Sequence, residues 1–422
     1  MQNTIAFKLA QIPAGVLLVG IDPHQQVHAV VVMTQQAQVL TKFKVPVNQR
    51  GFAGLEERVR ALVSAVGAPG AMWAIEAGSH HWRTLAYHLE SHGQQLRLVN
   101  PFTLKRNRDG DDLNKRKTDY RDAQMAAELL RTGKFTETTL VQGVYAELRA
   151  AHQGYQRAQM ATTRVKNLLK ALLDGHFPEF RQVFREVLGR TALAVLETGL
   201  APREIAALEA GAWVRELRCG PTGKYLRVKK LLRVHELAAT SLGVPAGAAG
   251  VCKEIGLLVA RARQLVAELT AWEERMAELL PQVPEYVWLR GIPGLGTISL
   301  AGVLAETGPL PRFRRGKQLI KLAGTNPTGA ESAGKVRERT PMSKKGRAGL
   351  RRVLWTAGMS LLRHNEDFRR WGKALRERPV HPLQAREVVG AAGNRLLRIL
   401  FALVKKGETY HMPKQMEVAA AA

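Results

Sequence analysis

The sequence predicts an α/β domain at the N-terminus followed by a long, mostly α-helical region. Within residues 1–140, apolar runs of strand length alternate with stretches of helical periodicity. From Leu148 onward, apolar or small residues recur in alternating steps of three and four, in two separate stretches. After Pro284 the chain becomes rich in Gly, Arg and Lys, with shorter helical patterns between loops. These observations define the expected fold class as α/β plus mostly α.

The N-terminal elements are expected in the order strand, strand, strand, helix, strand, helix, strand, helix. The expected strands are residues 16–21, 27–33, 39–45, 71–75 and 96–99, and the expected helices are residues 51–66, 80–91 and 119–130. The strands are rich in β-branched and other apolar residues, and short polar turns separate the first three. This order is that of an RNase H-like domain, which we assign to residues 1–140. In such a sheet the first and fourth strands are neighbours.

The central region, residues 141–283, is expected to be a helical, coiled-coil linker and dimerisation region. Its apolar positions keep a heptad-like rhythm over residues 148–172 and again over 251–279, in each case for about four heptads, which predicts a coiled coil. The two helices are predicted either to pair within one chain or to pair across a dimer. Residues 284–412 form the expected C-terminal domain, with a helix-hairpin-helix-like element, and residues 413–422 a disordered tail.

The charge of the chain predicts a polyanionic partner. There are 63 Lys and Arg residues against 36 Asp and Glu, a formal net charge of +27. Basic side chains that neutralise phosphates release condensed counterions, and this release favours nucleic-acid binding. The alternatives are a charge that serves solubility and binding to an acidic membrane surface. Because the sequence has neither an apolar run of about 18 residues nor a basic amphipathic terminal helix, we expect nucleic acid and no membrane.

The two cysteines, Cys219 and Cys252, have no paired spacing. They cannot form a zinc site between them, and a reduced, cytoplasmic protein is expected. The N-terminus does not resemble a signal peptide, because its short apolar run leads directly into a predicted strand.

Four carboxylates are expected to meet at one end of the predicted sheet. Asp22 follows the first strand and Glu76 the fourth, while Asp119 and Asp122 lie three residues apart on one helix face. Taken singly, a carboxylate after a strand is usually a turn residue, and a pair of aspartates on a helix usually belongs to a solvated face. Together they form a hard oxygen ligand set suited to Mg²⁺ or Mn²⁺. Two such ions about 4 Å apart can stabilise the attacking and leaving oxygens at a phosphate.

The segments around these carboxylates resemble the DEDD-type insertion-sequence transposases, a family that includes the Piv and MooV invertases and whose catalytic domain is related to the Holliday-junction resolvase RuvC. The N-terminal segments that carry the resemblance are Ile21-Asp22, Glu76-Ala-Gly-Ser79 and Lys117-Thr-Asp-Tyr-Arg-Asp122-Ala. It continues in Arg290-Gly-Ile-Pro-Gly-Leu-Gly296, Phe313, Leu322-Ala-Gly-Thr-Asn-Pro327, Glu331-Ser-Ala-Gly-Lys335 and Ser343-Lys-Lys-Gly-Arg-Ala-Gly-Leu-Arg351. The resemblance therefore covers most of the chain.

The resemblance implies a DNA transposase that cuts and rejoins element ends and target DNA in a prokaryotic nucleoid. In this family a C-terminal serine is taken as a nucleophile, and Ser332 matches it. Its neighbours Lys335, Arg337 and Arg339 are candidates to stabilise the charged phosphorus centre. An ordinary loop serine is the alternative, and Ser343 and Thr340 are competing nucleophiles. The resemblance also implies a structured guide RNA and a homo-oligomer, either a dimer or a tetramer.

A second candidate nucleic-acid contact is the turn 291–296, which is similar to a helix-hairpin-helix phosphate-binding turn. An ordinary Gly/Pro turn between helices explains it equally well. The basic residues near it are expected to contact the nucleic-acid backbone rather than bases. The full candidate set is Lys117, Arg121, Arg290, Gly294, Gly296, Arg312, Arg314, Arg315, Lys335, Arg337, Arg339, Lys344, Lys345 and Arg347.

Two other functions stay open at this point. One is a metal-dependent Holliday-junction-type endonuclease that uses the carboxylates without a covalent intermediate. The other is a non-catalytic basic scaffold for nucleic acid. The histidines at 24, 28, 80 and 81 lack the partner spacing of a zinc site, although His24, two residues after Asp22, could touch substrate.

Overall fold

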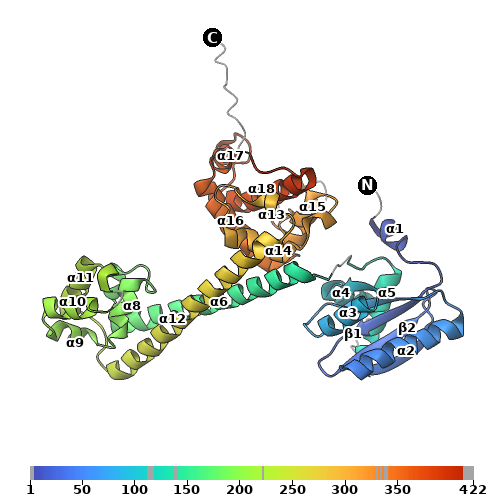
Figure 1. The fold of residues 1–422 in the computed structure, drawn as a ribbon, viewed down its shortest axis with the longest axis horizontal. Helices are drawn as coiled ribbons and strands as arrows, with labels where there is room; N and C mark the ends of the chain where they lie inside the picture. The colour runs from blue at the N-terminus through green and yellow to red at the C-terminus, as the bar shows by residue number, and fades with distance from the viewer. Residues whose placement is uncertain are drawn as a thin grey trace, which may run out of the picture. The chain divides into compact units, whose positions relative to one another are not determined.

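The structure, a computed structural model, describes residues 4–111, 118–136, 140–220, 223–328, 331–332, 335–336 and 341–411. It divides into two compact units, Met1–Leu140 and Val141–Ala422 (Figure 1). The first unit contains a five-stranded sheet, and the second is almost entirely helical.

The sheet of the first unit has the strand order β3-β2-β1-β4-β5. Its strands are β1 (Leu17–Asp22), β2 (Val27–Met33), β3 (Val39–Pro46), β4 (Ala71–Glu76) and β5 (Gln95–Val99). The pairs β1–β2 and β2–β3 are antiparallel, whereas the pairs β1–β4 and β4–β5 are parallel. The predicted neighbours, the first and fourth strands, are therefore paired, and the mixed sheet is compatible with an RNase H-like domain.

Helices cover both faces of this sheet. Along β1, Leu17, Val19 and Ile21 pack into one core with α2 (Gln49–Val66) and α3 (Trp82–Ser91). Leu18 belongs to the opposite core, which includes residues of α4 (Pro101–Asp111) and α5 (Asp119–Arg131). Because successive strand residues point to opposite faces, a strand covered on both sides is apolar throughout. The short helix α1 (Thr4–Leu9) and α4 were not expected from the sequence.

The second unit is organised around two long helices, α6 (Gly143–His176) and α12 (Ala248–Leu279), which pack along each other (Figure 1). They are antiparallel, because the start of α6 shares a core with the end of α12, and the end of α6 shares a core with the start of α12. A Cβ atom built at Gly154 would lie 2.5 Å from the ring of Trp272, so glycine permits the close approach there. Of the two pairings left open by the heptad pattern, the one within a single chain is found.

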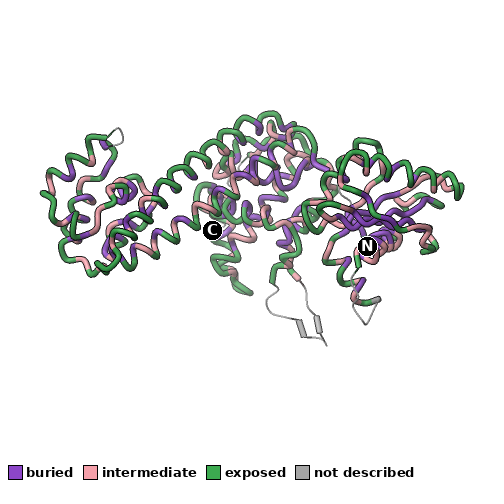
Figure 2. The backbone as a smooth tube through the Cα atoms, turned by 90° about the horizontal axis from the view of Figure 1, so that it is seen from below, coloured by how far each residue is buried: buried purple, intermediate pink, exposed green. Residues whose placement is uncertain are grey.

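Each end of this helix pair carries its own core. At one end lie α7 (Phe180–Val183), α8 (Arg190–Glu197), α9 (Pro202–Ala207), α10 (Ala210–Arg218) and α11 (Val228–Ala239). At the other end lie α13 (Tyr286–Leu289), α14 (Thr297–Thr307), α15 (Gly316–Ala323), α16 (Ala348–His364), α17 (Glu366–Glu377) and α18 (Ala385–Lys406). Figure 2 shows buried residues concentrated in the sheet and these helical cores, with exposed residues along the outer faces of the long helices. Within the described part of the chain, no helix has the length and apolar character needed to cross a bilayer.

Candidate active site

Sheet geometry places Asp22 and Glu76 beside each other. The parallel register pairs Ile21 of β1 with Ile75 of β4, and the next residue on each strand is a carboxylate. Because side chains alternate along a strand, Asp22 shares a face with Leu18, and Glu76 with Met72. Both carboxylates therefore lie on the face that α5 covers.

A glycine on β1 allows α5 to bring the other two carboxylates to the same place. A Cβ atom at Gly20 would lie 2.0 Å from the carbonyl oxygen of Ala123 and 2.7 Å from the amide nitrogen of Ala127, both in α5. Only glycine leaves room for backbone packed this closely. The helix begins where Thr118 caps it by accepting a hydrogen bond from the amide of Arg121. Its first turn therefore carries Asp119 and Asp122.

A pocket of about 380 Å³ lies between these elements. Three of the four carboxylates line it, those of Asp22, Glu76 and Asp122. Asp119 is joined to them by His24, whose Nε2 lies 3.0 Å from Oδ2 of Asp22 and 3.4 Å from Oδ1 of Asp119. The structure thus brings together the four carboxylates that the sequence singles out.

Three cationic side chains that the sequence did not indicate lie in the pocket wall or beside Asp119. Nη1 of Arg108, on α4, donates hydrogen bonds of 2.7 Å and 2.9 Å to the two carboxylate oxygens of Asp122. Nζ of Lys44 lies 3.8 Å from Oδ2 of Asp119, and Lys105 lines the pocket wall. Spacing along the sequence gives no signal for these residues. Arg108 lies on α4 and Lys44 on β3, whereas the carboxylates that they contact lie on α5.

Burial dominates the electrostatics of Asp22, which is 6% exposed. Burial raises the pKa of its carboxyl group, and His24 opposes this rise by stabilising the charged form. The neighbouring charges of Asp122 and Asp119 raise the pKa further. A carboxylate held ionised in this setting gains from any additional cation placed nearby.

The donor set fits a divalent ion. One ligand atom each from Asp22, His24 and Asp119 lies within 4.8 Å of the others, and the carboxylates of Glu76 and Asp122 face the same pocket. Carboxylate oxygens are the ligands that Mg²⁺ and Mn²⁺ prefer. The gathering of four carboxylates around one pocket, with Asp22 only 6% exposed, is the observation that supports such an ion here.

The candidate nucleophile belongs to the second unit. Ser332 lies on the two-residue strand β6 (Glu331–Ser332), which pairs antiparallel with β7 (Lys335–Val336) in the register Ser332 to Lys335. Arg337, Arg339 and Lys117 lie outside the described residues, as does the predicted tail from residue 413.

The remaining predicted basic contacts divide into exposed and internal residues. The exposed ones are Arg290, Arg314, Arg315, Lys344 and Lys345. Arg121 and Arg312 are half-buried, and Nη2 of Arg312 donates to the carbonyl of Thr307 at 2.7 Å. Arg347 donates to the carbonyl of Glu306, and its burial lowers the pKa of its guanidinium to about 10. Arg312 and Arg347 therefore already donate hydrogen bonds to backbone carbonyls within the protein.

The predicted hairpin turn precedes α14. Gly294 has a φ of +82°, a backbone conformation that favours glycine, and Gly296 is the N-cap residue of the helix. Both are thus explained by local backbone geometry, and a phosphate contact there stays a prediction.

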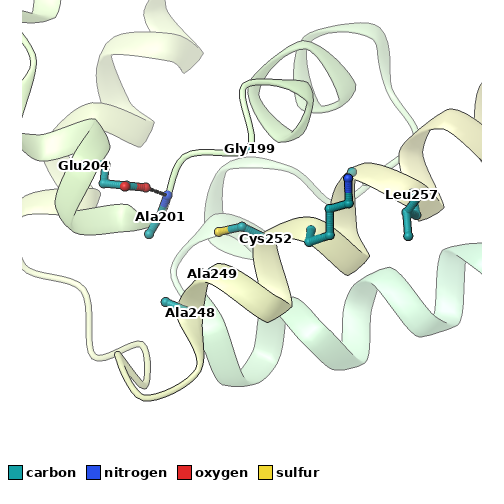
Figure 3. A pocket seen from close by; sticks show the side chains of 9 residues that line it. Gly199, Ala201, Glu204, Ala248, Ala249, Cys252 and Leu257 are labelled. Carbon is teal, nitrogen blue, oxygen red and sulfur yellow. Dashed lines mark hydrogen bonds between the residues drawn. The ribbon is translucent and has the colours of Figure 1, made fainter.

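A larger pocket, of about 610 Å³, lies where α12 begins (Figure 3). Sγ of Cys252 on its wall is 3.3 Å from Nε2 of His176. Burial raises the pKa of the Cys252 thiol and lowers that of the His176 imidazole, so at neutral pH burial favours the uncharged form of both groups. Since the thiolate is the reactive form of cysteine, this pair is not an activated nucleophile. The carboxylate pocket is the better candidate active site.

Comparison with known proteins identifies the family. A family model for DEDD transposases of the IS110 type matches residues 19–178, and a model described as "Transposase IS116/IS110/IS902 family" matches residues 287–372. The first match includes all four carboxylates, and the second includes Ser332. The matches place this chain among the transposases. It belongs to the IS110 family, and it is of the DEDD type.

One curated relative is the transposase for insertion sequence element IS1111A of Coxiella burnetii (strain RSA 493 / Nine Mile phase I). It is 29% identical over 143 residues, which are 33% of this chain and 38% of the relative. The matched part thus spans well under half of that relative's length.

Proposed function

We propose that this protein is a DNA transposase, or site-specific recombinase, that cuts and rejoins DNA with metal-bound carboxylates and a serine nucleophile. The observation that carries the proposal is the convergence of Asp22, Glu76 and Asp122 on one pocket, with Asp119 joined through His24. This arrangement occurs in a chain of the IS110 transposase family, within an N-terminal unit that we take to be RNase H-like.

The four carboxylates would hold Mg²⁺ or Mn²⁺. When bound, a pair of such ions polarises a phosphate and stabilises the attacking and leaving oxygens. The protein's own cations have a separate role. Lys105 and Arg108 line the pocket, where their charges favour a phosphodiester close to the carboxylates.

Ser332 would supply the attacking oxygen. Its Oγ gives up its proton and forms a bond to phosphorus while the bond from phosphorus to a DNA oxygen breaks. That oxygen takes up a proton and leaves as a DNA hydroxyl. A hydroxyl of a second DNA strand then displaces the serine, so that bond energy is conserved for rejoining. Lys335, Arg337 and Arg339 are the proposed partners of the phosphate charge.

The proposed partners are element-end and target DNA, a structured guide RNA and further copies of the chain in a dimer or tetramer. The surplus of basic residues, a formal net charge of +27, supports nucleic-acid partners. Light scattering tests the oligomer: a monomer both free and bound to nucleic acid would contradict it.

The experiment that tests the metal site is a cleavage assay on element-end DNA with RNA transcribed from the flanking non-coding sequence. Asp119→Asn should abolish Mg²⁺-dependent cleavage and leave nucleic-acid affinity unchanged or raised, because one repulsive charge is removed. Asp174→Asn, at an exposed position on α6, is the matched control and should cleave normally. Cleavage by Asp119→Asn at the wild-type rate would contradict the proposal.

The same assay separates the other two functions. If the protein is a junction-specific endonuclease without a covalent intermediate, the Ser332→Ala variant should cleave normally. The Asp22→Asn variant should lose activity. A non-catalytic scaffold would show no difference between either variant and wild type.

A further inference from the structure

A second cluster of ligand-type side chains lies on the opposite face of the sheet from the carboxylate pocket. Glu56 projects from α2, His88 from the last turn of α3, and His92 is the C-cap residue of α3. Nε2 of His88 lies 2.8 Å from Oε1 of Glu56, and Nδ1 of His92 lies 2.7 Å from the same oxygen. Residues four apart on a helix share a face, so the two imidazoles converge on one carboxylate.

The chemistry of this cluster differs from that of the carboxylate pocket. Two imidazole nitrogens and one carboxylate oxygen, all within 4.8 Å of one another, form a ligand set that zinc uses with a fourth position left for water. The carboxylate pocket offers mainly oxygen, which suits harder ions. We infer that Glu56, His88 and His92 bind a zinc-class divalent cation.

The burial of the three side chains suits a site with one open side. The side chain of Glu56 is only 9% exposed and that of His88 19%, whereas that of His92 is 49% exposed. The carboxylate thus lies at the base and His92 at the entrance. Zinc-to-ligand distances of about 2.1 Å put tetrahedral ligand atoms roughly 3.4 Å apart. Binding therefore requires the present contacts of 2.7 Å and 2.8 Å to open slightly, and the exposed His92 can make that movement.

Packing beneath the cluster holds His88 in place. The ring of Phe52 lies 5.3 Å from that of His88 and stacks on His28 at 5.7 Å with an interplanar angle of 18°. Nδ1 of the fully buried His28 accepts a hydrogen bond from the amide of His24. A bound ion would cross-link α2 to α3 and stiffen the packing that supports the loop of His24.

The test uses metal alone and the full chain. Because Asp22, His24 and Asp119 also form a possible ligand group, the background protein carries Asp22→Asn and Asp119→Asn. Zn²⁺ titration by calorimetry, and Co²⁺ titration followed by visible d–d absorption, should reveal one tight tetrahedral site in this background. Adding His92→Gln should weaken binding by at least about tenfold, since even the loss of a supporting partner costs that much. His411→Gln, in the second unit, is the matched control and should leave the affinity unchanged.

A further variant reports ligation directly. His92→Cys should retain Co²⁺ binding and add a sulfur-to-metal charge-transfer band. The inference is overturned if the background protein binds no Zn²⁺, if His92→Gln binds as tightly as the background, or if the cysteine variant binds Co²⁺ without that band. Circular dichroism of each variant separates lost binding from lost folding. None of these outcomes depends on DNA cleavage, so the inference and the proposed function can fail separately.

Discussion

Nη1 of Arg108 donates hydrogen bonds to both carboxylate oxygens of Asp122, at 2.7 Å and 2.9 Å, inside the candidate active site. Both residues are buried, with Asp122 only 3% exposed. The two hydrogen bonds of this ion pair offset part of the cost of removing both side chains from water.

Replacing Arg108 by Ala should therefore destabilise the N-terminal unit by about 3 kcal/mol, since it leaves a buried charge without its partner. Added Mg²⁺ should restore part of this loss if the carboxylates bind it. The matched control is Arg181→Ala, which breaks the exposed ion pair with Asp174 and should cost less than about 1 kcal/mol. Chemical denaturation of the three proteins, with and without Mg²⁺, measures both effects, and equal losses for the two variants would contradict this account of the pair.

Gly20→Ala should displace α5 from the sheet. The new Cβ atom would lie 2.0 Å from a carbonyl oxygen of that helix, so backbone must move. We expect a loss of about 3 kcal/mol, typical of severe overpacking, together with loss of cleavage because Asp119 and Asp122 move with the helix. Gly54→Ala, on α2 with nothing within 4 Å of its Cβ position, should instead stabilise by about 1 kcal/mol. Thermal unfolding and cleavage rates test both, and a fully active Gly20→Ala protein would contradict the proposed placement.

Gly154→Ala should weaken the pairing of the two long helices. Its Cβ atom would lie 2.5 Å from the Trp272 ring, and we expect a cost of about 2 kcal/mol. Gly256→Ala, on α12 where the Cβ position is open, serves as the control and should stabilise slightly. Unfolding at several protein concentrations gives the readout: since the helices pair within one chain, the loss should not depend on concentration.

The N-terminal unit should become less stable as the pH is lowered, because the buried His28 takes up a proton on unfolding. Burial, with the nearby histidines 24 and 81, lowers the pKa of its imidazole from 6.5 to about 4. The unfolded chain therefore binds a proton that the folded chain rejects. Stability is fully present above about pH 6.5 and declines as pH falls toward 4, by an amount on the order of 3 kcal/mol.

Hydrogen exchange of the β1–β2 segment, measured between pH 4 and 7 and corrected for intrinsic rates, follows this decline. His28→Phe keeps an aromatic ring against Phe52 and removes the titrating group, so its stability should depend less on pH. If the stability of this segment changes with pH equally in the wild type and in His28→Phe, the pH dependence comes from other groups.

Much of the N-terminal unit could be predicted from sequence because its signals are local. Buried strands such as β1 are continuous apolar runs, and a carboxylate directly after such a run stands out. The helix α4 gave no such signal, since its residues are largely polar or charged and lack an apolar stripe. Arg108, which it carries, could therefore not be linked to Asp122 before the fold was known.

Pairings between distant elements were the part that the sequence left open. The heptad patterns of α6 and α12 predicted long helices, but identical periodicity suits a partner in the same chain or in another. His88 and His92 have a four-residue spacing that is visible in the sequence, yet their shared partner Glu56 comes from another helix. The roles of Ser332 and of the basic residues remain predictions from the family resemblance.

If the DEDD carboxylates and Ser332 act in one reaction, as we propose, the serine should become covalently attached to DNA. Nicked element-end DNA is incubated with protein, RNA and Mg²⁺, denatured in detergent and separated on a gel. A protein–DNA adduct should form with wild type and with Ser64→Ala, an exposed serine of α2, and be absent with Ser332→Ala and with Asp22→Asn. An adduct that persists in Ser332→Ala would place the nucleophile elsewhere, with Ser343 the next candidate. Rejoined DNA without any adduct would contradict the serine mechanism and indicate direct attack by a DNA 3′-hydroxyl.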